Sequence, residues 1–351
     1  MRAVLLDSTH STPAIGEVER PRPVAGELLV KVAASSVNGF DAATAAGYLQ
    51  GMMEHRFPLV VGMDFAGTVE AVGDGVLGFA VGDAVFGVAR KPFLGAGSMA
   101  EYVTVPAGAG VAAIPAGLPV AHAGALGLAG SAALDAVTAV NPAAGETLLI
   151  SGATGGVGAL AVQLAAGRGV RVIATARPGA ETGFVLGLTG TKVYPVDYTA
   201  DLESQVRAVA PDGVDAVLHL AGDPEQLAGL LRPGGRLAST LIPGADAIAR
   251  ADIDVHAVMA DTSTQTLSDL ATRAAAGTCA FRSRPPTHST RPRRHSPPSQ
   301  PVPSASFRSP ARKPSKRRNS ESCPLSLSSA LDQVWVLRSP VPSATAASTS
   351  R

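Results

Sequence analysis

The residues best suited to bind a ligand lie in a glycine-rich run, LLISGATGGVGALAVQLA, at 148–165. The run starts as an apolar strand and ends as a helix. Glycines between the two permit a tight bend, let the backbone approach a pyrophosphate, and expose helix N–H groups that favour anions. We therefore predict a dinucleotide site formed by Gly152, Ala153, Thr154, Gly155, Gly156, Val157 and Gly158. The alternative is a purely structural turn, because glycine-rich turns join strands to helices in many folds.

The next strand, VRVIATAR at 170–177, indicates which dinucleotide binds. Enzymes that use NAD place a carboxylate near the end of this strand to bind the ribose. This chain has Thr175 and Arg177 there, and its first acidic residue is Glu181. Because an arginine pairs with the 2′-phosphate that a carboxylate would repel, we predict NADPH, with Thr175 and Arg177 in the site. The alternative is that Arg177 is an ordinary surface residue.

Two patterns divide the chain into domains. Residues 1–122 contain short strands broken by turns, such as ELLVKVAASSV and GTVEAVG, which predict an antiparallel, barrel-like domain. Residues 123–278 alternate strands such as VDAVLHLAG and GRLAST with helices, which predicts parallel pairing in a doubly wound α/β sheet. The glycine-rich turn belongs to this second domain.

The formal net charge of +1 conceals a change of composition at residue 279. Residues 279–351 hold 13 of the 29 Lys and Arg residues, 2 of the 28 Asp and Glu residues, and none of the 38 glycines. At face value this segment is a disordered basic tail that cannot bury enough apolar surface to fold. A nucleic-acid-binding arm is the functional alternative, but it rests on the tail alone, and we expect no nucleic-acid partner.

Nothing in the sequence indicates a membrane or secreted protein. Apolar stretches such as 123–133 are too short or too rich in small residues to span a bilayer. The first six residues lead directly into a strand-like run, without the pattern of a secretory signal. We expect a cytoplasmic protein with no membrane partner.

Seven segments occur in an order that is more specific than any one of them. They are SSVNGFDAATAAGY at 35–48, FPLVVGMDFAGTVEAVGDGV at 57–76, FAVGDAVFG at 79–87, AEYVTVPA at 100–107, LAGSAALDAV at 128–137, GATGGVG at 152–158 and LLRPGGRLAST at 230–240. Together they resemble the quinone oxidoreductase (zeta-crystallin-like) branch of the medium-chain dehydrogenase/reductase family. The resemblance implies a chaperonin-10-like catalytic domain, then a Rossmann domain, and a homodimer. It also implies hydride transfer from NADPH to a quinone or an activated alkene or carbonyl compound.

The resemblance further implies a site without metal. Zinc-dependent relatives bind a catalytic zinc through a Cys in the first segment and a Gly-His-Glu in the second, where this chain has Asn38 and the sequence GMD at 62–64. Neither Asn38 nor Met63 is a ligand that zinc prefers. A structural site of four cysteines is not available to a chain with two. We therefore predict a zinc-free protein.

Without a metal, hydrogen-bond donors must orient and polarise the substrate. Asn38 and Tyr48 match family positions that face the cleft, and Asp41 lies beside them in sequence. These three are the predicted catalytic residues. The alternative for Asn38 and Asp41 is a side chain that closes a turn at the end of a strand.

Two further positions bear on the cofactor. The family usually reads LAGLTALDA, with its threonine near the nicotinamide, whereas this chain reads LAGSAALDA and has Ala132 there. The adjacent Ser131 is kept as a cofactor contact, although it points elsewhere on a helix. Tyr198 either reaches the adenosine phosphate, as a residue in that position does in relatives, or closes the preceding strand. The missing threonine supports an alternative function, a catalytically silent NADPH-binding protein.

The basic tail has a second explanation, a shifted reading frame. When the residues are back-translated and reading starts at the third base of the Thr278 codon, permitted codons generate LRVPVAATHPLDEAP. From Arg294 to Phe307 they permit ALAAFAAGTLGKL. These are the strand, helix and final strand expected here in the family, where they complete the catalytic domain. The hypothesis predicts poor solubility and weak or absent turnover for the chain as written.

Overall fold

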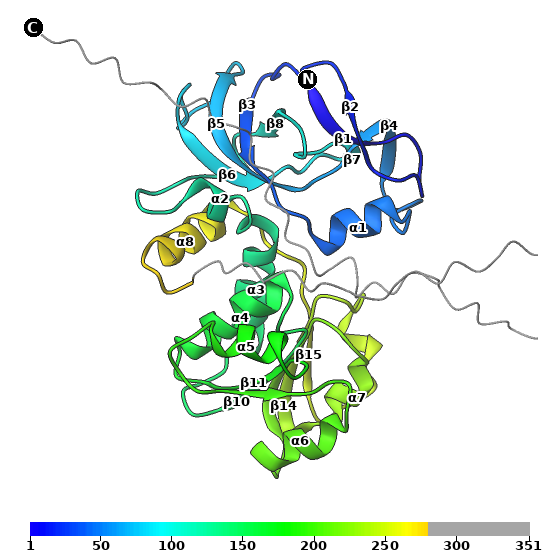
Figure 1. The fold of residues 1–351 in the computed structure, drawn as a ribbon, viewed down its shortest axis with the longest axis vertical. Coiled ribbons are helices and arrows are strands. Elements are labelled where there is room, and N and C mark those ends of the chain that lie inside the picture. Colours follow the sequence, from blue (N-terminus) through cyan, green and yellow to red (C-terminus); the bar gives the residue numbers. More distant parts are fainter. Residues whose placement is uncertain (280–351) are drawn as a thin grey trace, which may run out of the picture.

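The computed structural model describes residues 1–279, which form two lobes (Figure 1). The lobe at the top of Figure 1 contains β1–β9 and the helix α1, Gly39–Ala45, and is called the barrel lobe. The lobe below it contains the sheet β10–β15 with its helices and is called the nucleotide lobe. The disorder and the shifted frame were predicted for residues 279–351, and all of these except the buried Cys279 lie outside the described residues.

Two sheets make up the barrel lobe, with strand orders β2-β1-β4-β7 and β8-β3-β5-β6-β9. Alternate residues of β3 and β5, including Leu28, Val30, Phe65 and Val69, are buried in one core cluster, as the two-residue periodicity predicts. The strands are β1 Arg2–Leu6, β2 Ala14–Glu17, β3 Glu27–Ala34, β4 Glu54–Val60, β5 Asp64–Val72, β6 Ala84–Val88, β7 Phe93–Ala96, β8 Tyr102–Pro106 and β9 Val111–Ala113. The expected β-rich fold of this part of the chain is confirmed.

The nucleotide lobe is a six-stranded parallel sheet of order β12-β11-β10-β13-β14-β15. Its strands are β10 Thr147–Ser151, β11 Arg171–Thr175, β12 Val193–Val196, β13 Val214–His219, β14 Leu231–Ser239 and β15 Asp254–Ala257. Its helices, and those that join it to the barrel lobe, are α2 Val120–Ala123, α3 Gly127–Val140, α4 Gly156–Ala166, α5 Ala180–Leu186, α6 Leu202–Val209, α7 Pro224–Ala228, the 3-10 turn Ala245–Ala247 and α8 Thr264–Ala275.

Helices cover both faces of this sheet. Leu148 and Ile150 of β10 pack in a core cluster with residues of α3, α4 and α8, whereas Leu149 packs in a second cluster with residues of α6 and α7. Successive side chains of a strand point to opposite faces, so both faces are apolar and every residue of β10 is buried. The doubly wound fold expected from the sequence is confirmed.

The strand order reverses at β10, which has β11 on one side and β13 on the other. Ligands of open parallel sheets bind outside the carboxyl ends of the strands at such a reversal. The glycine-rich turn follows β10 directly and therefore lies at this point.

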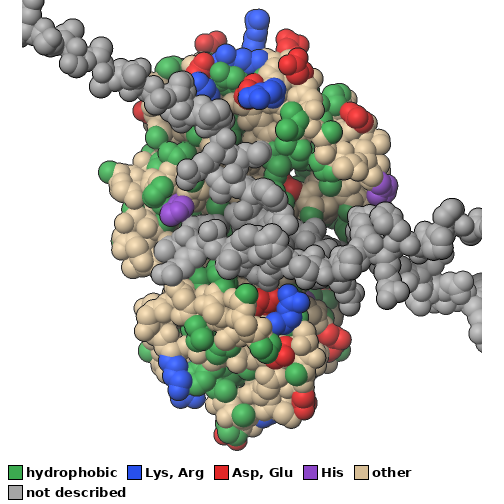
Figure 2. Space-filling view, in the orientation of Figure 1, with side chains coloured by type: hydrophobic (Ala, Val, Ile, Leu, Met, Phe, Trp, Pro, Cys, Tyr) green, Lys and Arg blue, Asp and Glu red, His purple; other side chains and the backbone are tan. Residues whose placement is uncertain are grey.

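Residues 1–279 contain no helix that is long and apolar enough to cross a bilayer. On the face that Figure 2 shows, basic and acidic side chains lie intermixed near both ends of the molecule.

Cys279, where the described part of the chain ends, is buried, and burial raises the pKa of its thiol to about 11. This cysteine is therefore a protonated, weakly reactive core residue at neutral pH.

Candidate active site

The glycine-rich turn has one glycine that the fold itself requires. Gly158 lies in the first turn of α4, against the backbone of the preceding loop. A Cβ atom at Gly158 would lie 2.2 Å from the carbonyl oxygen of Gly152 and 2.7 Å from the Cα of Ala153. The helix can pack this closely on the strand only because residue 158 has no side chain. Gly152, with a φ of +81°, provides the bend that follows β10.

Two other glycines of the turn are not required by packing. A Cβ at Gly155 would lie 3.4 Å from the nearest atom, and one at Gly156 would lie 3.5 Å from Ala129, both ordinary contact distances. Among the described residues no side chain caps this end of α4. The first turn of the helix thus presents bare backbone, with N–H groups that favour an anion. These features fit the pyrophosphate of a dinucleotide.

Thr175, which the sequence places in the cofactor site, supports the glycine turn. It is buried at the end of β11, and its Oγ1 accepts a hydrogen bond of 2.9 Å from the backbone N–H of Gly152. The same hydroxyl lies 3.4 Å from the carbonyl oxygen of Ile150, to which it donates. Thr175 therefore holds the glycine turn in place, and its influence on a cofactor passes through Gly152.

Arg177 and Tyr198 come together beyond the ends of β11 and β12. The Arg177 guanidinium carbon lies 5.9 Å from the centre of the Tyr198 ring. Its Nε donates to Glu181 at 2.8 Å, and the backbone N–H of Arg177 donates to the same carboxylate at 2.9 Å. Half of the Arg177 side chain remains exposed, whereas Glu181 is buried. The predicted phosphate-binding arginine is thus held in place by a carboxylate that offsets part of its charge.

Asn38 is bound to a buried carboxylate that the sequence analysis did not single out. Its Nδ2 donates to Asp64 Oδ2 at 2.9 Å, and Ser36 donates to the same oxygen at 2.6 Å. The other oxygen, Oδ1, accepts the backbone N–H of Leu128 at 2.7 Å, at the start of α3. Burial raises the pKa of Asp64, whereas these three donors lower it. Asp64 therefore connects the barrel lobe to the helix that leads into the nucleotide lobe.

A signal for Asp64 was present in the sequence. It is the acidic residue of the GMD triplet, where zinc-dependent relatives have Gly-His-Glu. The triplet argues against zinc through Met63, and its last residue, Asp64, is the one that binds Asn38.

Asp41 closes the first turn of α1, Gly39–Ala45. Its Oδ2 accepts the backbone N–H of Asn38 at 2.7 Å, so the Asp41 side chain closes this turn. The carboxyl is almost fully buried, and burial raises its pKa from 3.8 to about 7, with a smaller contribution from the nearby Asp64 charge. At neutral pH a large fraction of Asp41 is therefore protonated.

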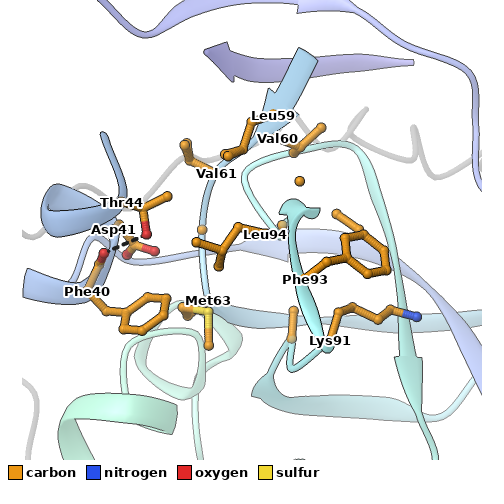
Figure 3. A pocket seen from close by; sticks show the side chains of 15 residues that line it. Phe40, Asp41, Thr44, Leu59, Val60, Val61, Met63, Lys91, Phe93 and Leu94 are labelled. Atoms are coloured by element: carbon orange, nitrogen blue, oxygen red, sulfur yellow. Dashed lines mark hydrogen bonds between the residues drawn. The ribbon is translucent and has the colours of Figure 1, made fainter. Parts of the chain in front are cut away.

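Asp41 also lines a small, partly open cavity with mostly apolar walls in the barrel lobe (Figure 3). The cavity lies between α1, the β4–β5 connection and the region around β7, and Figure 3 shows Phe40 and Met63 on one side and Phe93 on the other. Its lining residues are Phe40, Asp41, Thr44, Leu59, Val60, Val61, Gly62, Met63, Ala89, Lys91, Phe93, Leu94, Gly95, Ala96 and Gly97. Met63 occupies the position of the zinc-binding histidine of relatives, so the cavity includes that position.

The other predicted residues lie apart from this cavity. Tyr48 is half exposed in the turn after α1 and does not line the cavity. Ser131 is fully buried in α3, where its Oγ has no hydrogen-bond partner among the described residues, and Ala132 beside it is also buried. No group of three or more His, Cys, Asp or Glu residues suited to hold a metal ion occurs in residues 1–279.

Comparisons with known proteins agree with this architecture. The alcohol dehydrogenase GroES-like domain matches residues 24–116. The chain is 30% identical to an alcohol dehydrogenase superfamily protein from Novosphingobium aromaticivorans, with a TM-score of 0.68 over 79% of this chain and 88% of that one. This chain belongs to the medium-chain dehydrogenase/reductase family.

Family members with quinone oxidoreductase names are among its relatives. A chloroplast envelope quinone oxidoreductase homolog from Arabidopsis thaliana is 34% identical over 214 residues. That match covers 58% of this chain and 62% of the relative, so the chain spans less than two thirds of its length. A mycobacterial family member whose structure was solved with NADPH is 25% identical, with a TM-score of 0.68 over 80% of this chain and 91% of that one.

The raised pKa of Asp41 leads to a test by Asp41→Asn. The folded carboxyl binds its proton more tightly than the unfolded one, so the stability it contributes is present at low pH and is lost as the pH rises from about 4 to about 7. The expected slope is about 1.4 kcal/mol per pH unit. Urea unfolding of both proteins from pH 5 to 8 should show a free-energy difference that changes with pH in this direction. A constant difference would contradict the raised pKa.

Proposed function

We propose that this chain is an NADP(H)-dependent, zinc-independent oxidoreductase that reduces quinones or activated alkenes and carbonyl compounds. The observation that carries the proposal is the bare first turn of α4 at the reversal of the parallel sheet, where neither Gly155 nor Gly156 is required by packing. The nearby Arg177 supports a phosphorylated ribose. The apolar side chains around Met63, which include Phe40, Phe93 and Leu94, support an apolar acceptor.

Each part of the site has a distinct task. NADPH, when bound, supplies a hydride. The N–H groups of α4 and the turn that Thr175 holds bind the pyrophosphate, while Arg177 and Tyr198 bind the 2′-phosphate. Tyr48 is the proposed hydrogen-bond donor toward the acceptor, while Asn38, whose Nδ2 donates to Asp64 and Ser36, holds the wall of the site. Asp41, with its pKa near 7, holds a proton at the cavity wall.

The donor groups present argue for chemistry without zinc. Met63 offers a thioether and Asn38 an amide, whereas catalytic zinc in proteins is held by thiolate, imidazole and carboxylate groups. Asn38 Nδ2 is also committed to Asp64 and Ser36. Polarisation of the acceptor then rests on hydrogen bonds and on exclusion of water by the apolar wall.

A screen of quinones and enones, with NADPH or NADH as donor and with the reading frame after Thr278 restored, tests the activity. The expected result is acceptor-dependent oxidation of NADPH that is unaffected by metal chelators. Tight NADPH binding without turnover on any acceptor would favour the second candidate, a catalytically silent NADPH-binding protein, which Ala132 supports. Loss of turnover on chelation would refute the zinc-independent reaction.

Cofactor preference is tested by Arg177→Ala. A charge-assisted hydrogen bond contributes about 1.5–3 kcal/mol, so kcat/KM for NADPH is expected to fall roughly 10- to 100-fold, with little change for NADH. Glu181→Gln is the matched variant. It retains an acceptor for the backbone N–H of Arg177 but removes the opposing charge, so it should increase the preference for NADPH. Equal losses with both cofactors in Arg177→Ala would contradict a 2′-phosphate site.

A further inference from the structure

Four buried polar side chains form a row across the carboxyl ends of four neighbouring strands. They are Thr175 of β11, Ser151 of β10, His219 of β13 and Ser239 of β14. Ser151 is the register partner of His219, and His219 is the register partner of Ser239. Each is less than a tenth exposed. Polar groups buried in an otherwise apolar sheet are unfavourable unless they are hydrogen-bonded, so their partners indicate what the row does.

The first two members hold loops that border the turn after β10. Thr175 accepts the N–H of Gly152, as described above. Ser151 Oγ donates to the carbonyl oxygen of Ala221 at 2.6 Å, and its carbonyl oxygen accepts the N–H of Leu220 at 3.2 Å. The loop after β13 is thereby attached to the end of β10.

His219 and Ser239 hold the next two loops. His219 Nε2 lies 3.1 Å from the carbonyl oxygen of Gly222, which can only accept, so Nε2 carries the proton. His219 Nδ1 then accepts the Ser239 hydroxyl at 2.8 Å. Ser239 Oγ in turn accepts the N–H of Leu241 at 3.0 Å. Burial lowers the pKa of His219, which keeps the ring neutral, although the nearby Asp223 charge acts in the opposite direction.

We propose that His219 and Ser239 are a positioning pair for the nicotinamide half of the bound dinucleotide. This inference rests on the proposed function. Arg177 places the adenosine half beyond β11, and the glycine turn places the pyrophosphate beyond β10. A dinucleotide that continues across the reversal of strand order reaches the ends of β13 and β14. The loops found there are 220–222 and 240–242, which this pair holds.

The pair acts through backbone that it fixes. Loss of the Ser239 hydroxyl would leave the buried Nδ1 of His219 and the N–H of Leu241 without their present partner, which is unfavourable for buried polar groups. The loops would then sample several arrangements. Because hydride transfer requires the reacting atoms within about 3–3.5 Å, a small displacement of the nicotinamide lowers the rate steeply.

Binding of two ligands to the full chain tests the proposal. The ligand 2′,5′-ADP contains the adenosine half alone, whereas NADPH contains both halves. Ser239→Ala and His219→Gln are expected to bind 2′,5′-ADP within twofold of the unchanged chain and to bind NADPH about fivefold to tenfold more weakly. Thr175→Val is the matched control from the same row. It should weaken both ligands alike, because Thr175 holds the turn that serves the shared phosphate.

Turnover provides a second measurement. Both variants are expected to lose about tenfold in kcat and to show a larger isotope effect with NADPH deuterated at C4, since hydride transfer becomes slower relative to other steps. If one variant does not fold, the other decides the result. Equal weakening of both ligands, or wild-type behaviour, would overturn the proposal. If the unchanged chain binds NADPH but reduces no acceptor, the reductase function fails while the ligand comparison still decides this inference.

Discussion

Replacing Gly158 with alanine is expected to abolish NADPH binding, with a loss of affinity of about 100-fold or more. The added Cβ would lie 2.2 Å from a backbone oxygen, and neither the loop nor the helix has a flexible side chain there that can move aside. Overpacking of this kind costs about 1–3 kcal/mol, so the melting temperature should fall as well. NADPH fluorescence titration and thermal unfolding measure the two effects.

Gly156→Ala is the control for this experiment. Its Cβ would meet only Ala129, at an ordinary distance of 3.5 Å, so folding should be unaffected. The methyl group would occupy space above the first turn of α4, and NADPH affinity should fall roughly tenfold, which corresponds to about 1.4 kcal/mol. Wild-type affinity in Gly156→Ala would contradict the use of this space by the cofactor. Wild-type affinity in Gly158→Ala would contradict the packing argument.

Restoring the reading frame after Thr278 is expected to raise turnover at least tenfold and to increase the soluble yield. The restored segment would begin LRVPVAATHPLDEAP and replace a tail that holds 13 basic residues among 73. The family resemblance implies that this segment completes the catalytic domain, and without it apolar surface would remain uncovered. Purification and NADPH oxidation assays of both chains measure the difference.

A chain that ends at Thr278 is the control for the tail itself. All three chains are expected to bind NADPH alike, because the sheet, the glycine turn and Arg177 lie before residue 279. If the chain as written turns over as fast as the restored one, the shifted frame is refuted. A single-base difference found by sequencing the coding DNA would support it directly.

Local sequence was sufficient for the features that depend on neighbours along the chain. The turn between β10 and α4 was predicted because Gly152 to Gly158 alone determine its bend and its close packing. The capping pair Asn38 and Asp41 is three residues apart, and turn closure had been named for both. The ion pair of Arg177 with Glu181 is also local, since it joins the loop after β11 to the first turn of α5 across four residues.

The tertiary structure decided which residues that are far apart in the sequence lie in contact. Asp64 meets Leu128, and His219 meets Ser239, only because separate strands and helices bring them together. The cavity likewise combines α1 with residues near β7. Burial then changes the chemistry, since the pKa of Asp41 near 7 follows from desolvation that no spacing reveals. The sequence by itself determined the family, the order of the lobes and the glycine turn. Only the fold decided which side chains hold the loops around it, because those contacts depend on strand order and register.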